Sequence, residues 1–128
     1  MQKRGGKGDG VCAFITFVTG LQVTVKLAHW ATDSYGRHVA LDELHASLQD
    51  LGDRFVEAWM GRHGRPTSRC IGAIETRAVA LKEDAIAPAL RDAAGHLSSM
   101  QGLETDLASL RDDMVAALSK ALYLLQLR

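Results

Sequence analysis

Apolar residues recur every three or four positions between His38 and Met60. An α-helix turns once every 3.6 residues, so this spacing places them on one helical face. The residues of this apolar seam are Leu41, Leu44, Leu48, Leu51, Phe55 and Trp59. A seam of this length needs other elements to cover it. The pattern therefore favours a fold built from packed helices, with one helix over residues 38–60.

Three further helices are expected from similar patterns. They span residues 11–32, 84–100 and 105–128. The segment DSYGR, residues 33–37, is expected to separate the first two helices, because Gly36 can adopt the backbone angles of a turn. Residues 67–83 fit a loop, a short helix or an extended strap. The sequence predicts an all-α fold, a four-helix bundle.

Length and charge limit the kinds of protein that this chain can be. Its 128 residues are enough for one domain with a core of its own. Fifteen basic residues balance fifteen acidic ones, which excludes a strong overall attraction to DNA or to membranes. Residues 1–10, with Lys3, Arg4 and Lys7, are expected to be a flexible basic tail, and residues 11–128 a single domain. Such a tail would add at most weak contacts with DNA phosphates.

The start of the chain also has features of a secretory signal, because an apolar run follows the basic tail. However, Thr16, Thr19, Gln22 and Thr24 interrupt this run, and no small-residue cleavage site follows it. The unbroken apolar part is also shorter than the roughly 18 residues of a membrane span. We expect a buried helix here and no membrane contact.

The two cysteines, Cys12 and Cys70, belong to no CxxC motif. Without a pairing pattern, they are expected to be free thiols in a reducing compartment. The sequence therefore favours a cytoplasmic location.

Polar side chains form a stripe on the helix expected over residues 38–60. His38, Asp42, Asp53 and Glu57 fall within an arc of about 100°, given 100° per residue, and His45 lies beside them. A solvated helix face is the simple explanation of such a stripe. The alternative is a metal site, because imidazole and carboxylate ligands together suit iron, manganese or zinc.

One copy of this helix cannot bring the whole stripe to one ion. His38 and Asp53 are about 22 Å apart along the helix axis, whereas each ligand must lie within about 2.0–2.2 Å of the ion. Two copies packed antiparallel about a two-fold axis would bring His38 and Asp42 of one subunit to Asp53 and Glu57 of the other, at two identical sites. His29 precedes His38 by nine residues and could reach the same end across a short turn, although a lone histidine there is more often a core residue.

These residues resemble the Dps, or mini-ferritin, pattern. The resemblance rests on HW at residues 29–30, on a second histidine that opens the next helix, and on the Asp and D-x-x-x-E that follow. It implies a ferritin-like fold and a ferroxidase centre between two subunits, with His29, His38, Asp42, Asp53 and Glu57 as the iron ligands. It further implies oxidation of Fe²⁺ by peroxide or oxygen, and a homo-oligomer that extends from a dimer to a hollow shell.

A second resemblance covers more of the chain. HWATDSYGRHVALDEL, DRFVEAWMGRHGR and LRDDMVAALSKALYLLQL are similar to segments of an uncharacterised ferritin-like family of bacteriophages and large DNA viruses. A viral protein would act in the host cytoplasm or in the virion. Two functions are expected from these observations: an iron-binding mini-ferritin, or a non-catalytic structural or interaction protein that keeps the ferritin-like fold.

Overall fold

The computed structural model describes residues 7–76, 82 and 84–127, and these residues fold into helices joined by short connections. The elements are η1 (Lys7–Val11), α1 (Cys12–Ala31), α2 (Tyr35–His63), α3 (Ser68–Gly72), α4 (Ile86–Ser98) and α5 (Thr105–Leu125). No strand occurs in the described part of the chain. The prediction of an all-α fold is therefore confirmed.

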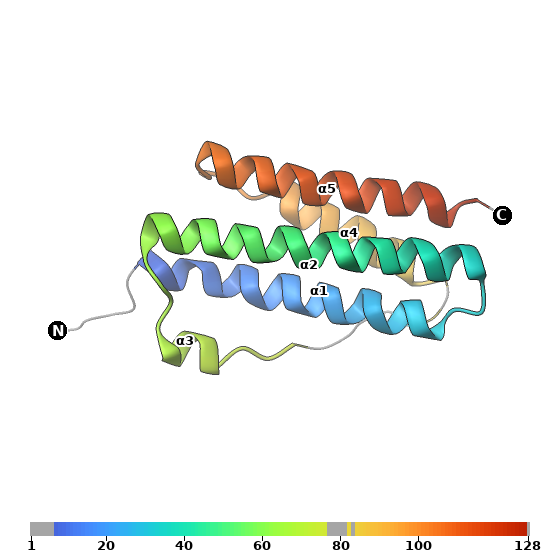
Figure 1. Ribbon diagram of the computed structural model, residues 1–128, viewed down its shortest axis with the longest axis horizontal. Helices are drawn as coiled ribbons and strands as arrows, with labels where there is room; N and C mark the ends of the chain where they lie inside the picture. Colours follow the sequence, from blue (N-terminus) through green and yellow to red (C-terminus); the bar gives the residue numbers. More distant parts are fainter. Residues whose placement is uncertain (1–6, 77–81, 83, 128) are drawn as a thin grey trace.

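Four longer helices, α1, α2, α4 and α5, lie alongside one another, and the short α3 lies apart from them near the start of α1 (Figure 1). Helix α2 packs against both α1 and α5, and α5 also packs against α4. The contact between α1 and α4 is much smaller. The predicted ranges 11–32, 84–100 and 105–128 each correspond to one of these helices to within a few residues.

The predicted apolar seam of α2 lies in the core between these helices. Leu41, Leu44, Leu48, Leu51 and Phe55 are buried, whereas Trp59 is half-buried. Burying one such side chain contributes about 1.5–3 kcal/mol relative to leaving it in water. The seam is therefore sufficient to hold α2 in the centre of the molecule, with its polar stripe facing outward.

The turn between α1 and α2 is shorter than the sequence predicts. Helix α2 begins at Tyr35, because the Ser34 side chain accepts a hydrogen bond from the backbone N–H of Arg37 and caps the helix. Gly36 thus lies inside α2 and not in the turn, so that prediction was wrong. Only Thr32, Asp33 and Ser34 connect the two helices, and this shortness brings the end of α1 close to the start of α2.

Residues 67–83, for which several structures were expected, contain the short helix α3. No residue of α3 is buried, and residues 77–81 and 83 lie outside the described residues. Pro88 occupies the first turn of α4, where proline is tolerated because the first N–H groups of a helix have no partner within it. At the other end of α4, the Arg111 side chain donates hydrogen bonds to the carbonyls of Leu97 and Met100.

The last part of the predicted basic tail, residues 1–10, is folded. Residues 7–10 belong to η1, and Gly8 is buried against the backbone carbonyls of Gly64 and Arg65. Lys3 and Arg4, on which the expected DNA contact depends, lie outside the described residues.

Among the described helices, the stretch Gly8–Ala31 alone is long and apolar enough to cross a membrane, by length and composition only. A core helix of a soluble protein and a signal sequence pass the same test. Phe14, Val18 and Leu21 of this stretch are buried in the helical core, which agrees with the expected buried helix.

Candidate metal centre

His29, near the end of α1, and His38, in the first turns of α2, stack against each other beside the short turn. Their ring centroids are 3.8 Å apart, with an angle of 22° between the ring planes. His29 Nδ1 lies 2.7 Å from the backbone oxygen of His38, and His38 Nδ1 lies 2.9 Å from the backbone oxygen of His29. Each ring is therefore fixed by the backbone of the other residue.

These two hydrogen bonds determine the tautomer of the neutral rings. A carbonyl oxygen can only accept a hydrogen bond, so each Nδ1 must carry a proton and donate it. In the neutral imidazole, the proton on Nδ1 leaves Nε2 with a free lone pair. Metal-bound histidines in proteins are oriented in this way, with the second ring nitrogen bonded to a carbonyl or carboxylate. The pair thus presents two oriented Nε2 atoms.

Asp42 lies one helical turn after His38 and is the nearest carboxylate to the pair. Its Oδ1 is 3.8 Å from His29 Nε2 and 3.5 Å from the Lys26 ammonium group. His29 is only 6% exposed, whereas the Asp42 side chain is 60% exposed. The cluster therefore combines a buried imidazole with a carboxylate open to solvent, and Lys26, which also lies over the Trp30 ring, partly neutralises that carboxylate.

His45 lies on the same side of α2. Burial lowers the pKa of His45 below its ordinary value of 6.5, and the positive charge of Lys26 lowers it further, although Asp42 acts in the opposite direction. His45 is thus favoured in its neutral form next to the cluster.

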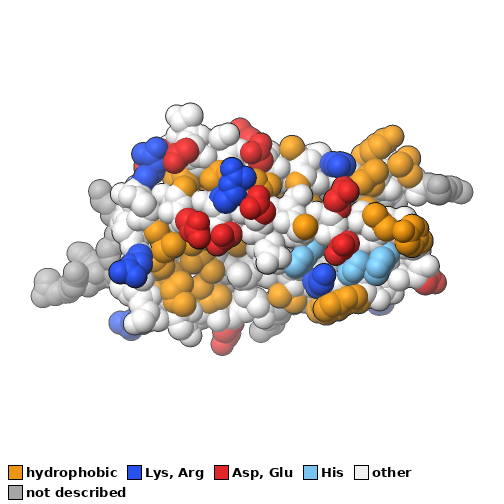
Figure 2. Space-filling model, in the orientation of Figure 1, with side chains coloured by type: hydrophobic (Ala, Val, Ile, Leu, Met, Phe, Trp, Pro, Cys, Tyr) orange, Lys and Arg blue, Asp and Glu red, His pale blue; other side chains and the backbone are white. Residues whose placement is uncertain are grey.

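Asp53 and Glu57 lie toward the other end of α2, so a single chain does not bring the five predicted ligands together. Both are exposed, and neither forms an ion pair with another described residue. Asp53 borders an open hollow of about 710 Å³ between α1 and α2. Figure 2 shows this face, with histidines beside acidic side chains toward one end and further acidic side chains beside an apolar area toward the other.

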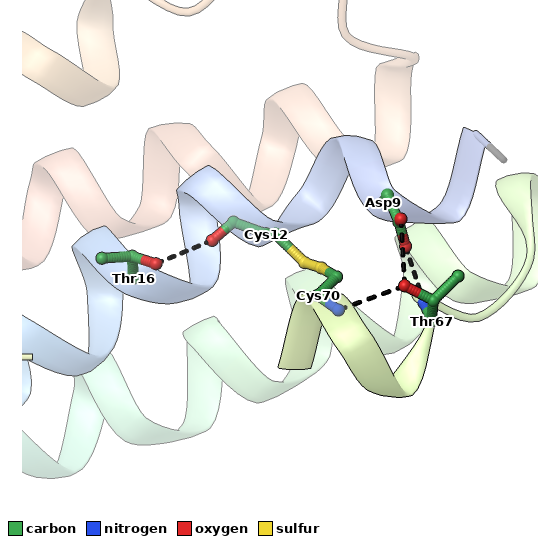
Figure 3. Close-up of a disulfide and its surroundings, with 5 residues drawn as sticks. All are labelled: Asp9, Cys12, Thr16, Thr67 and Cys70. Atoms are coloured by element: carbon green, nitrogen blue, oxygen red, sulfur yellow. Dashed lines mark hydrogen bonds between the residues drawn. A yellow bond between two sulfur atoms is a disulfide. The ribbon is translucent and has the colours of Figure 1, made fainter. Parts of the chain in front are cut away.

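A second group of metal-competent side chains joins distant segments, and the sequence patterns do not predict it. Asp9, Cys12 and Cys70 have ligand atoms that all lie within 4.8 Å of one another. Cys12 and Cys70 form a disulfide, with their Cα atoms 6.3 Å apart (Figure 3). The prediction of two free thiols was therefore wrong. Cys70 follows Cys12 by fifty-eight positions, and no local motif indicates a pair at that distance.

The fold and the cluster define an all-α protein with a histidine and carboxylate group at the turn between its first two long helices. Comparison with known families identifies it further: the chain belongs to a family of unknown function, DUF5856, whose model matches residues 29–125. All five predicted ligands and Cys70 lie within the matched residues, whereas Cys12 lies before them.

A curated relative comes from Enterobacteria phage T4. It is described as an uncharacterized 14.6 kDa protein in the mobD-ri intergenic region, and it is 34% identical over 62 residues. The match covers 48% of this chain and 48% of the relative, so about half the length of that protein is spanned. The phage origin agrees with the expected viral connection. No solved structure matches the chain.

Proposed function

We propose that the protein is a mini-ferritin-like iron-binding protein, with a ferritin-like four-helix bundle and Fe²⁺ sites shared between two subunits. The observation that carries this proposal is the reciprocal pair of His29 and His38. Two imidazoles with both Nδ1 atoms bonded to carbonyls offer both Nε2 lone pairs to a cation. The side-by-side packing of α2 against α1 and α5, and of α5 against α4, supports the bundle.

The spacing within the cluster suits one ion. Two ligand atoms that each lie about 2.0–2.2 Å from a common ion are about 3–4 Å from each other. His29 Nε2 and Asp42 Oδ1 are 3.8 Å apart, which falls within that range. An incoming Fe²⁺ would compete with the Lys26 ammonium for Asp42, and the divalent ion has the greater charge. Manganese and zinc suit the same ligands.

A partner subunit would supply the remaining ligands. If two α2 helices pack antiparallel about a two-fold axis near residues 47–48, His38 faces Glu57 of the second copy and Asp42 faces Asp53. Both pairs fit the same antiparallel alignment of the two α2 helices, because the residue numbers in each pair add up to the same value. The hollow beside Asp53 would lie at the centre of this interface. The dimer would contain two identical sites, and further copies could extend it to a shell.

The chemistry of this site is the controlled oxidation of Fe²⁺. One hydrogen peroxide molecule accepts one electron from each of two Fe²⁺ ions and, with two protons, becomes two water molecules. The carboxylates of Asp53 and Glu57 stabilise the more highly charged Fe³⁺, because oxygen ligands suit a hard cation. The exposed position of Asp42 leaves the ion open to the oxidant. The protein would thus act as a ferroxidase, with iron as its substrate.

A non-catalytic structural or interaction protein is the second candidate. Two observations favour it: Asp42 already has a cationic neighbour in Lys26, and large aromatic side chains are exposed nearby. Trp30 is 63% exposed and Tyr35 is 82% exposed, on the helical turns next to His29 and His38. In this case the histidine pair would only fix the turn between α1 and α2, and the aromatic side chains would contact a partner.

Anaerobic titration of the metal-free protein with Fe²⁺, together with light scattering for mass, tests the proposal. Saturable binding of about one or two Fe²⁺ per chain in a dimer or larger assembly is expected. His38→Ala and Glu57→Ala should each abolish it. Glu43→Gln is the matched control, since Glu43 is an acid of the same helix that pairs with Lys120 away from the polar stripe. An unchanged iron stoichiometry in both alanine variants would contradict the proposal.

Mixing the two inactive variants tests whether the site is shared. In a dimer with one His38→Ala chain and one Glu57→Ala chain, one site lacks both ligands and the other keeps both. Random pairing of equal amounts after refolding should therefore restore about a quarter of the wild-type iron sites. A site within one chain would give no recovery. If the folded wild-type dimer binds no Fe²⁺, the non-catalytic structural or interaction protein remains as the candidate function.

A further inference from the structure

We propose that Asp9, Cys12 and Cys70 form a redox-controlled site for a thiophilic divalent cation, with zinc as the best-suited ion. The reduced thiols would bind the ion, and formation of the disulfide would release it. This site is distinct from the histidine cluster. Cys12 begins α1 and His29 lies near its end, about 26 Å away along the helix axis.

The three ligands converge from two separate segments (Figure 3). Asp9 and Cys12 are three residues apart on continuous helix, which places them on one face. Cys70 approaches from α3, and the three ligand atoms all lie within 4.8 Å of one another. Two thiolates on a tetrahedral zinc ion are about 3.8 Å apart, because each Zn–S bond is about 2.3 Å. Rotation about the Cα–Cβ bonds of the two cysteines can provide that separation after reduction.

Thr67 fixes the position of both the carboxylate and the second cysteine. Its backbone N–H donates to Asp9 Oδ1 over 2.6 Å, and its hydroxyl donates to Asp9 Oδ2 over 3.1 Å. The same hydroxyl accepts a hydrogen bond from the backbone N–H of Cys70. Each carboxylate oxygen keeps a second lone pair for a cation. Carboxylates that bind metals are commonly oriented by hydrogen bonds of this kind.

The chemistry of the donors selects the ion. Two thiolates and one carboxylate carry three negative charges, and thiolates favour zinc over magnesium or calcium. Three protein ligands leave the fourth position of a tetrahedral zinc ion to water. All three side chains are half-buried, so both the ion and small redox reagents can reach them.

The redox steps balance with a dithiol reductant and hydrogen peroxide. Thiol–disulfide exchange with the dithiol transfers two electrons and two protons to the protein disulfide, and the dithiol becomes a disulfide. Zinc then displaces the two thiol protons. In the reverse direction, the two thiolates give two electrons to hydrogen peroxide, which takes up two protons and forms two water molecules. The new disulfide no longer supplies thiolates, and the zinc ion leaves.

This exchange would preserve the attachment of α3. No residue of α3 is buried, so the helix depends on the bond to Cys12 and on the contacts between Asp9 and Thr67. A bound ion would replace the disulfide as the link between α1 and α3. In both oxidation states of the cysteines, α3 would then remain attached to α1.

Zinc titration of the full-length chain tests this proposal, with a chromophoric zinc chelator as competitor and a phosphine as reductant. The reduced chain should bind about one Zn²⁺ more than the oxidised chain does, and this additional binding should release about two protons. Cys12→Ser and Cys70→Ser should each abolish this additional binding. Asp9→Asn, which keeps both thiols, should weaken it by about tenfold or more. His38→Ala should leave it unchanged.

Alkylation provides a second readout. Bound zinc should slow the alkylation of both thiols in the reduced wild-type chain. Circular dichroism measures the helicity of each variant and so checks that it is folded. If Cys12→Ser does not fold, Cys70→Ser carries the test, since α3 contributes no buried residue. A reduced, folded chain that binds no more zinc than the oxidised chain, or Cys70→Ser with undiminished binding, would overturn the proposal. Fe²⁺ binding is measured on Cys70→Ser as well, because this variant keeps all the proposed iron ligands. The iron result therefore tests the proposed function separately from the zinc result.

Discussion

The two ends of α1 are fastened to the rest of the molecule in different ways. At its end, His29 and His38 stack and bond to each other's backbone across nine residues of sequence. At its start, the disulfide of Cys12 joins a residue fifty-eight positions away. The first attachment is non-covalent and local, and it depends on the hydrogen bonds and stacking of two imidazole rings. The second is covalent and distant, and it depends on redox conditions. One helix is thus held by two chemically independent contacts.

Removal of the covalent attachment should have the largest effect on stability. Cys70→Ser opens a loop of fifty-eight residues, and disulfides of this kind contribute about 2–4 kcal/mol, mainly by restricting the unfolded chain. Urea unfolding of the oxidised wild-type and variant proteins, in the absence of metal, measures the difference. A reductant should destabilise the wild type by a similar amount and leave Cys70→Ser unchanged. Equal stability of both oxidised proteins would contradict the structural role of this bond.

The contact next to the disulfide can be weakened without a change of cysteine. A Cβ atom at Gly8 would collide with the backbone carbonyls of Gly64 and Arg65, which cannot move as a flexible side chain can. Gly8→Ala should therefore destabilise the protein by about 1–3 kcal/mol. Gly36→Ala is the matched control, because Gly36 lies in α2 with no atom in the way, and it should stabilise the protein by about 0.5–1 kcal/mol. Thermal unfolding of both variants gives the comparison.

The attachment at the histidine pair should be weaker. His38→Ala removes the ring stacking and the hydrogen bond from His38 Nδ1 to the backbone oxygen of His29, at a cost of about 1–2 kcal/mol. In His38→Asn, a side-chain N–H remains near the position of Nδ1, but Nε2 is absent. This variant should recover part of the stability and none of the proposed iron binding. If His38→Asn bound iron normally, His38 would not be a ligand.

The smallest effect is expected from pH. Burial keeps the pKa of His45 below its ordinary 6.5, so the unfolded chain takes up a proton before the folded chain does. The stability of the metal-free protein should therefore be complete above about pH 6.5 and fall as the pH decreases through that value. His45→Gln should flatten this part of the profile of stability against pH.

A hydrogen bond from Arg62 lowers the pKa of Asp106 below its ordinary 3.8. The contribution of that carboxyl to stability is therefore lost only at lower pH.

The local features of the fold could be predicted from the sequence. The apolar seam of α2 is periodic enough to place Leu41 to Phe55 in the core, and the polar stripe follows from the same period. The position of Gly36 was mistaken because a glycine indicates a turn only when no stronger signal lies nearby, and Ser34 is the stronger signal as a helix cap. Sequence reasoning also placed His29 and His38 at one end, because a short turn leaves few alternatives.

Distant contacts could not be predicted in this way. Nothing in the residues around Cys12 indicates that Cys70 lies beside it, since the pairing depends on how the chain returns after α2. The same limit applies to Asp53 and Glu57. Their meeting with the histidine pair depends on a second chain, so the sequence and a single subunit leave it as a proposal.

The disulfide also determines how far the chain can be extended. Cys12 and Cys70 enclose all of α1 and α2 in a covalent ring, outside which lie α4 and α5. When the oxidised protein is pulled by its two ends, the chain between Cys12 and Cys70 cannot lengthen, although these residues are fifty-eight positions apart. An extended residue spans about 3.4 Å, so the disulfide prevents about 200 Å of chain from being stretched by the applied force. A machine that unravels the protein from its C-terminus would release α5 and α4 as a single thread and then meet a closed loop.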